Sequence, residues 1–264
     1  VSYLLNSGVR PGSLMAIAFG RKAAEQLEER LIQLGVPVAK NLTDRSGVVV
    51  ATFNALGRRL LLSNGFEGNL LSTDARVRKL VRAALGKAGI QIPTVRGFDN
   101  LDLVIKQLAR VCRGLINPNA EEIEFITKGD KTEKQPFPPI YTAIRNLQAE
   151  QRSITFDDQI FKALTLTMGE PLVRHDLQRR FQYILVDEYQ DLNKAQISLV
   201  RTLAGGSGQV FAVGDDDQLI YSWRDAKTQH LLEDFERFFP KSTTFPLEIN
   251  YRCAQRIVTL SQRL

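Results

Sequence analysis

The chain has 264 residues, 44% hydrophobic and 24% charged, which is typical of a globular protein with one large or two ordinary domains. Two distant cysteines, Cys112 and Cys253, and two histidines, His175 and His230, offer little for zinc or Ser-His-Asp chemistry. No apolar run reaches the roughly 18 to 20 residues of a membrane span, and no signal-peptide pattern opens the sequence. We therefore expect a cytoplasmic protein without membrane contacts.

The first segment alternates strand and helix patterns. Residues 14–19 and 47–53 are short apolar runs of the kind that forms buried parallel strands. Each is followed by apolar residues at helical spacing, up to Gly35 in the first case and over residues 56–62 in the second. This alternation predicts an α/β domain.

The next hundred residues favour helices. Residues 74–88 and 98–115 carry apolar side chains three or four positions apart. Residues 117–139 contain several prolines and mixed charges and are predicted to be an exposed loop or a partly ordered connection. Helical patterning resumes over residues 140–180, so we expect no strands from about Phe66 until residue 182.

Strands return at residues 182–188 and 209–215, and both runs end on acidic residues. Ligand-binding groups lie at the carboxyl ends of the strands in a parallel sheet. In the first run, Asp187 and Glu188 can offer one carboxylate to a magnesium ion and the other to a water, as nucleoside triphosphate hydrolysis requires. At this point a strand that ends in a solvated acidic turn is an equally open interpretation.

The residues that follow narrow the choice. They resemble, in chain order, the motifs of the UvrD/Rep/PcrA family of superfamily 1 DNA helicases. The matching segments, beginning with the family's second and third helicase motifs, are residues 187–196, 213–224, 18–24, 51–56, 154–158 and 247–252. They cover nearly the whole chain.

The resemblance implies roles for individual residues in ATP hydrolysis. Asp187 would hold Mg²⁺, with Glu188 beside it to orient or deprotonate the attacking water. Gln218 would sense the γ-phosphate, and Arg252 would contact it as an arginine-finger-like group. Tyr251 would stack on the adenine of ATP.

The resemblance also implies a path for single-stranded DNA, along which aromatic side chains stack on bases. The implied DNA-binding residues are Phe19, Arg21, Thr52, Phe53, Asn54, Tyr221, Trp223 and Arg224. Phe19 and Phe53 end apolar runs, so a core position remains open for both. Asp215 and its two acidic neighbours can equally serve as a turn and a cap.

The sequence also departs from the family pattern. It contains no Gly-x-x-x-x-Gly-Lys-Ser/Thr phosphate loop, and we expect the chain to begin just after that loop and to end soon after the start of the second motor domain. Gly20 and Arg21 replace a usual Thr-Asn pair, Asn54 replaces a His, and Asp225 replaces a Gly. These changes affect DNA contacts rather than the class of protein.

The resemblance implies a RecA-like parallel sheet flanked by helices (the P-loop NTPase fold), with a mostly helical inserted subdomain. We expect residues 1–65 and 171–246 to form the ATP-binding domain, residues 66–170 the insertion, and residues 247–264 the start of a second RecA-like domain. Nine Lys and Arg residues against three acids give residues 71–120 a charge of +6. A solvated helix face or a DNA contact through Arg76, Arg78, Lys79 and Arg82 explains this excess.

The implied function is that of an ATP- and Mg²⁺-dependent helicase or translocase on single-stranded or partly duplex DNA, moving 3′ to 5′ and present here as a fragment. Two alternatives remain open. One is a non-hydrolysing, helicase-like module that binds nucleic acid or regulates a partner. The other is a magnesium nuclease, although a nuclease has no need of Gln218 or of the pair Tyr251 and Arg252.

Overall fold

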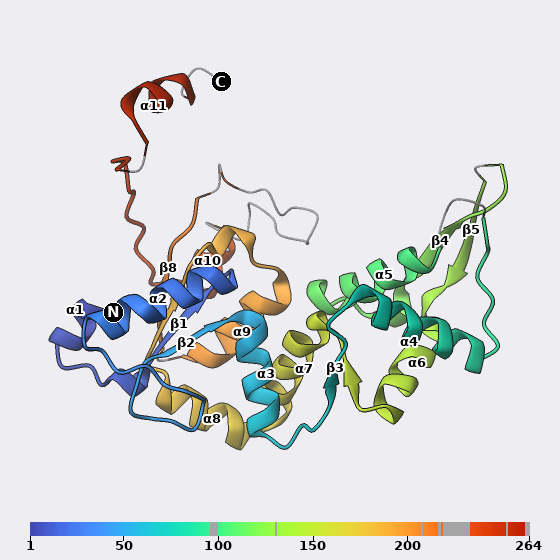
Figure 1. Cartoon of the computed structure of the whole chain (residues 1–264), viewed down its shortest axis with the longest axis horizontal. Coiled ribbons are helices and arrows are strands. Elements are labelled where there is room, and N and C mark those ends of the chain that lie inside the picture. Colours follow the sequence, from blue (N-terminus) through green and yellow to red (C-terminus); the bar gives the residue numbers. More distant parts are fainter. Residues whose placement is uncertain are drawn as a thin grey trace.

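The computed structural model describes residues 1–95, 100–129, 131–206, 208–215, 218, 233–251 and 253–261. Its centre is a parallel four-stranded sheet in the order β2-β1-β7-β8 (Figure 1). The strands are β1 (Leu14–Ala18), β2 (Val49–Thr52), β7 (Tyr183–Val186) and β8 (Gln209–Ala212). The predicted strands, and with them the α/β class, are confirmed.

Helices cover both faces of this sheet because alternate residues of β1 point to opposite sides. Leu14 and Ala18 pack in a small core with α2 (Arg21–Gln33) and the N-terminal α1 (Ser2–Asn6). Met15 and Ile17 face the larger core. The helices of that core are α3 (Phe53–Ser63), α7 (Phe156–Gly169), α8 (Pro171–Arg180) and α9 (Lys194–Ala204).

A second lobe, which we call the insertion lobe, lies beside the sheet domain (Figure 1). It consists of α4 (Asp74–Lys87), α5 (Leu101–Gly114), β4 (Glu122–Ile126), β5 (Thr132–Pro136) and α6 (Phe137–Glu150), and it has its own hydrophobic core. The expected helices over residues 74–88 and 98–115 are confirmed for the described residues.

The prediction of an exposed loop or a partly ordered connection over residues 117–139 is wrong. After a short 3₁₀ turn at Pro118–Ala120, β4 and β5 form an antiparallel hairpin. Ile123 and Phe125 of β4 are 4% and 0% exposed, because alternate residues of the strand face the lobe's core. The expectation of no strands after Phe66 is wrong as well, since the short pair β3 (Asn69–Leu70) and β6 (Ser153–Ile154) also lies in this stretch.

The parallel pair β3 and β6 carries the chain into the insertion lobe and back out of it. The helix after β6, α7, packs into the core of the sheet domain through Ile160, Ala163 and Leu164. Packing alone would therefore end the insertion at about residue 152 rather than at residue 170. The division into domains otherwise stays a prediction.

The C-terminal part includes α10 (Glu233–Phe238) and α11 (Gln255–Ser261), and α11 lies away from the sheet domain (Figure 1). None of the helices in the described part of the chain combines the length and the apolar character that a membrane span requires.

Candidate nucleotide-hydrolysis site

Asp187 and Glu188 lie where β7 ends, at the carboxyl edge of the sheet. The backbone N–H of Asp187 donates to the carbonyl of Ile17 at 3.0 Å, so strand pairing continues up to this residue. Glu188 then adopts a left-handed conformation, with φ 51° and ψ 51°. That conformation costs a residue with a Cβ about 1 to 2 kcal/mol, and such strain clusters at functional sites.

The chain after Glu188 is tightly held. A 3₁₀ turn, Tyr189–Asp191, leads into α9, whose first turn is closed by a reciprocal cap between Asn193 and Gln196. Tyr189 is fully buried, and its ring packs edge-on against Phe235 of α10 at a centroid distance of 5.2 Å. The two carboxylates therefore project from a turn that is anchored on its C-terminal side.

Gln190 joins this turn to the end of β8. Its side chain is almost entirely buried. The amide Nε2 donates to Oε2 of Glu188 at 2.7 Å, and Oε1 accepts from the backbone N–H of Asp215 at 3.1 Å. Asp215 in turn accepts from Nε2 of Gln218 at 2.5 Å. Glu188, Gln190, Asp215 and Gln218 thus form one hydrogen-bonded chain across two strand ends.

Gln190 belongs to the matching segment 187–196, but the sequence assigned it no role of its own. The available signal was an amide two residues after a pair of carboxylates that were assigned to catalysis. What makes Gln190 a bridge is the neighbouring position of β8, which the backbone bond from Tyr189 N–H to the carbonyl of Val213 at 2.9 Å reinforces.

The electrostatics of the turn favour a bound cation. Partial burial, and then the adjacent carboxylate of Glu188, raise the pKa of Asp187 above its ordinary value. Carboxylates at this edge suit Mg²⁺, which uses one or two protein carboxylates and takes its other ligands from water and phosphate oxygens. The described residues contain no cluster of three or more acidic, histidine or cysteine side chains that would hold a metal by themselves. The carboxylates of Asp187 and Glu188 match the protein share of a Mg²⁺ site that takes its other ligands from water and phosphate oxygens.

The implied DNA-binding residues near β1 and β2 lie at the same edge as Asp187, since Ala18 pairs with Thr52 and Ile17 with Val186. Thr52 is the N-cap of α3 and accepts from the backbone N–H of Ala55 at 3.3 Å. Arg21, the first residue of α2, and Asn54 are exposed.

The two aromatic residues of this group differ from these polar residues. Phe53 begins α3 and is 2% exposed, so the structure favours the core interpretation for this side chain, which offers no surface to a base. Phe19 is partly buried against the same core. The DNA-contacting role of Phe19 stays a prediction.

One implied residue, Tyr251, is described and is not brought to this site. Tyr251 is 88% exposed and lies on the extended stretch before α11. Tyr221, Trp223, Arg224 and Arg252 lie outside the described residues. Their roles in DNA binding and γ-phosphate contact stay predictions.

Comparison with known proteins identifies the family. Residues 1–240 match the UvrD/REP helicase N-terminal domain. The chain is 32% identical over 274 aligned residues to a protein of Staphylococcus aureus named "ATP-dependent DNA helicase PcrA", and the match covers 100% of this chain and 35% of that protein. It is also 32% identical to "DNA helicase II" of Salmonella typhimurium, covering 96% of this chain and 34% of that protein.

The chain spans about a third of the length of the curated relatives that it matches. The match extends over the sheet domain with its acidic edge and over the insertion lobe. The parallel sheet flanked by helices is the P-loop NTPase fold of this domain. The chain therefore belongs to the UvrD/REP helicase family and corresponds to its N-terminal domain.

Proposed function

We propose that the chain is the ATP-binding part of an ATP-dependent DNA helicase or translocase that moves 3′ to 5′ on single-stranded or partly duplex DNA in the cytoplasm. The hydrogen-bonded chain from Glu188 through Gln190 to Asp215 and Gln218 carries the proposal. It supplies one connected set of polar groups at the edge where a parallel sheet binds nucleotides.

In this proposal each polar group has one task. Asp187 holds Mg²⁺, which neutralises charge on the phosphates when it is bound. Glu188 accepts a proton from the attacking water, and Gln190 holds Glu188 in place. Gln218 senses the γ-phosphate. Its hydrogen bond to Asp215 links it to the rest of the hydrogen-bonded chain. Arg252 and Tyr251 complete the site from the second motor domain.

The test uses the full-length reading frame that encodes this chain. The substitution Glu188→Gln should lower DNA-stimulated ATP hydrolysis by about 100-fold or more, because general base catalysis contributes about 10² to 10⁴. DNA binding should be unchanged, since Glu188 is not assigned to the DNA path. Equal hydrolysis rates in the two proteins would refute the proposed role of Glu188.

The second candidate is a helicase-like module that binds nucleic acid without hydrolysing ATP. The Gly-x-x-x-x-Gly-Lys-Ser/Thr loop, whose backbone amides and lysine bind the phosphates, does not lie within these 264 residues. We expect negligible ATP hydrolysis by this chain alone, and robust DNA-stimulated turnover by the purified chain would contradict that expectation. Hydrolysis by the full-length protein separates the two candidates.

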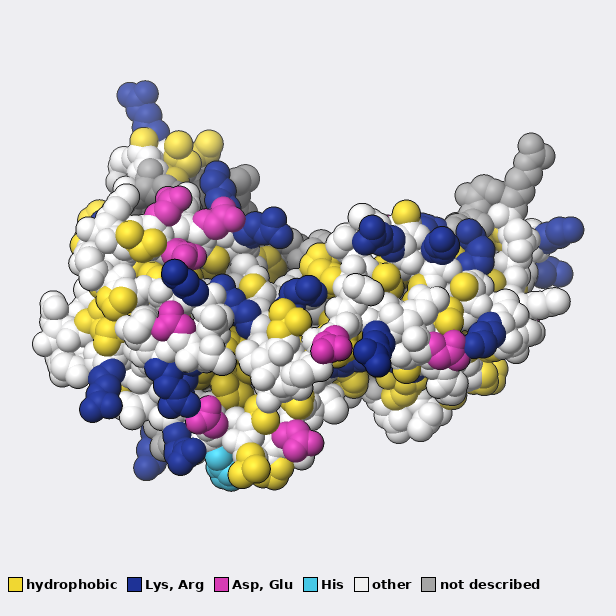
Figure 2. All heavy atoms as spheres, turned by 60° about the horizontal axis from the view of Figure 1, so that its bottom comes forward, with side chains coloured by type: hydrophobic (Ala, Val, Ile, Leu, Met, Phe, Trp, Pro, Cys, Tyr) yellow, Lys and Arg dark blue, Asp and Glu magenta, His cyan; other side chains and the backbone are white. Residues whose placement is uncertain are grey.

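The insertion lobe supports a DNA contact, but with fewer cations than the sequence suggested. Of its basic residues, Arg78 pairs with Asp102, Lys87 with Glu150 and Arg110 with Glu121. Arg76, Lys79 and Arg82 are exposed on α4 and have no ion pair among the described residues. Arg78, Lys79 and Arg82 line a shallow hollow there. Lys and Arg side chains recur along the visible surface of this lobe (right half of Figure 2).

Fluorescence anisotropy with a single-stranded oligonucleotide over a salt series tests this contact. Replacing Arg76, Lys79 and Arg82 with Ala should weaken binding and reduce the steepness of its salt dependence by about 2, because each phosphate contact adds about 0.7 to the slope. A matched control removes three exposed cations from elsewhere, Arg10, Lys40 and Lys241. An equal change of slope in both triple variants would mean that net charge, and not a contact between α4 and DNA, causes the effect.

A further inference from the structure

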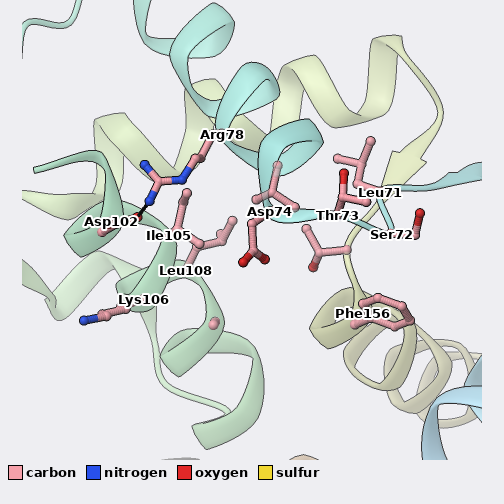
Figure 3. Close-up of a pocket in the computed structure, with 13 residues that line it drawn as sticks. Leu71, Ser72, Thr73, Asp74, Arg78, Asp102, Ile105, Lys106, Leu108 and Phe156 are labelled. Carbon is pink, nitrogen blue, oxygen red and sulfur yellow. Dashed lines mark hydrogen bonds and ion pairs between the residues drawn. The ribbon is translucent and has the colours of Figure 1, made fainter. Parts of the chain in front are cut away.

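Among the described residues, the insertion lobe and the sheet domain do not share a continuous hydrophobic core. Their buried residues form separate clusters. A cavity of about 280 Å³ lies between α4, α5 and the first turn of α7. We call this boundary between the insertion lobe and α7 the seam. Figure 3 shows Phe156 of α7 on one side of this cavity and Ile105 and Leu108 of α5 on another. Apolar packing across the seam is therefore interrupted.

The backbone connection at the seam is also slight. The pair β3 and β6 contributes few bonds, among them Asn69 N–H to the carbonyl of Arg152 at 2.7 Å and Leu71 N–H to the carbonyl of Ile154 at 2.8 Å. Two strands of two residues each cannot by themselves hold a lobe of this size in one orientation, because short isolated strand pairs are only marginally stable in water.

The body of α7 is fixed to the sheet domain. It packs closely against α3 at Gly57, where a Cβ would lie 2.9 Å from the carbonyl oxygen of Gln159. Ile160, Ala163 and Leu164 belong to the core of the sheet domain. α7 is therefore part of the sheet domain, and its first turn faces the insertion lobe.

Two carboxylates in that first turn hold two helices of the insertion lobe. Asp158 is fully buried and accepts from the guanidinium of Arg145 and from Nε2 of Gln148 at 2.6 Å, both on α6. Asp157 forms a two-pronged ion pair with Arg113 of α5, at 2.8 and 3.1 Å. We call Cys112, Arg113, Arg145, Gln148, Asp157 and Asp158 the joint.

Asp158 has every interaction that a buried charge requires. Its Oδ2 also accepts from the backbone N–H of Thr155 at 2.8 Å, which closes the N-terminal cap of α7. Burial alone would favour the neutral acid, but Arg145 and these hydrogen bonds hold the pKa of Asp158 below its ordinary value. Arg145 further lies over the rings of Tyr141 in the insertion lobe and Phe161 in α7, at 4.8 and 5.9 Å.

The joint lies next to the helix that follows the acidic edge. α5 packs against both α7 and α9, and α9 begins directly after the turn of Asp187 and Glu188. A change in the orientation of α5 would therefore press on the helix that leads out of the hydrolysis site.

We propose that Asp158 is a positioning residue that fixes the insertion lobe to the sheet domain, so that the lobe and the acidic edge move as one body. The consequence for DNA-coupled hydrolysis rests on the proposed function. The mechanical claim does not, and it is tested on this chain without ATP or DNA.

The thiol of Cys112 reports on the joint directly. Its side chain is buried beside Arg145 and Asp158, and burial, then the charge of Asp158, raise the pKa of Cys112 to about 12. A thiol reagent therefore modifies Cys112 only when the joint opens, since the thiolate is the reactive form. Replacing Cys253, the other cysteine, with Ser makes the readout specific.

In the Cys253→Ser background, Asp158→Asn should raise the labelling rate of Cys112 by about 100-fold or more while circular dichroism still shows a folded chain, because removing one partner leaves the largely buried Arg145 without its counter-charge. The rates are compared at equal thiolate fraction, since loss of the Asp158 charge also lowers the pKa of Cys112. Arg113→Gln, at the less buried pair, should give a smaller rise in the same direction. The matched control Asp176→Asn breaks the exposed pair with Arg45 in the sheet domain and should leave labelling unchanged. Labelling that follows global unfolding in every variant would overturn the proposal.

A distance measurement separates positioning from stability. In a Cys112→Ala, Cys253→Ser background, where no native thiol can take a label, spin labels at Lys79→Cys in α4 and Glu28→Cys in α2 should give a narrow distance distribution with Asp158 present and a broad one with Asp158→Asn. Adding Arg145→Gln, which removes the unpaired charge, should narrow the distribution again. An unchanged distribution in folded Asp158→Asn would refute the joint. A broadened distribution with unaltered DNA affinity in the anisotropy assay would leave the joint standing and count against DNA contact by the lobe.

Discussion

Two aspartates, Asp187 and Asp158, are partly and fully buried, and their surroundings shift the pKa of the two carboxyls in opposite directions. Asp187 lies beside a second carboxylate in a strained turn, and its pKa is raised. Asp158 is more deeply buried, yet it is matched by Arg145 and three hydrogen-bond donors, and its pKa is lowered. The difference separates a carboxylate that we propose binds Mg²⁺ from a contact that is complete within the chain.

The largest expected effect on stability comes from replacing Asp158. Asp158→Asn should lower the free energy of unfolding by about 3 to 5 kcal/mol, because it leaves the largely buried guanidinium of Arg145 without a counter-charge. Urea unfolding followed by circular dichroism measures the change. Asp176→Asn, at an exposed ion pair, should cost no more than about 1 kcal/mol. Similar losses in the two variants would show that the buried pair at Asp158 stabilises the fold no more than the exposed pair at Asp176.

The next effect concerns the bridge between the two strand ends. Gln190→Ala should cost about 2 kcal/mol, since it removes two hydrogen bonds of a buried side chain and leaves the backbone N–H of Asp215 without its acceptor. Hydrogen exchange at the Asp215 amide should accelerate, which locates the effect. Gln33→Ala, on the exposed end of α2, serves as the control and should change stability by less than about 0.5 kcal/mol. Unchanged exchange at Asp215 would show that the bridge is not formed in solution.

The pH dependence of stability sharpens the comparison. A carboxyl whose pKa is lowered by folding stabilises the folded state above its unfolded pKa of about 3.9 and loses that contribution as the pH falls through the folded value. The stability difference between the parent chain and Asp158→Asn should therefore be constant from about pH 5 to 8 and shrink below about pH 4. Urea unfolding at several pH values measures it. A difference that persists unchanged into the acid range would mean that the charge of Asp158 is not what stabilises the joint.

The smallest expected effect has the opposite sign. A carboxyl whose pKa is raised by folding costs stability as the pH rises through that range, so Asp187→Asn should slightly increase the free energy of unfolding at neutral pH, by less than about 1 kcal/mol since the group is largely solvated. Excess Mg²⁺ should stabilise the parent chain more than the variant. Thermal unfolding with and without Mg²⁺ measures both changes. A lower free energy of unfolding for Asp187→Asn would show that other groups in the chain already stabilise the charge of Asp187.

Much of the sheet domain was predictable because its signals are local. The apolar runs at residues 14–19 and 182–188 are typical of buried parallel strands, and the acids that end the second run lie at the carboxyl edge of the sheet. The hairpin at residues 122–136 was missed because β4 has only two core residues, Ile123 and Phe125, among prolines and charges. Phe53 was left open because an aromatic residue after a strand is compatible with both core and edge positions.

The sequence by itself determined the α/β class, the family resemblance and the placement of Asp187 and Glu188, since each depends on residues that are adjacent in the chain. Only the tertiary structure decided what those residues touch. Gln190 reaches Asp215 across 25 positions, and Asp158 meets Cys112 across 46. Such partners are chosen by how strands and helices pack, because the free energy of a buried polar group depends on the groups that surround it in space and not on its neighbours along the chain.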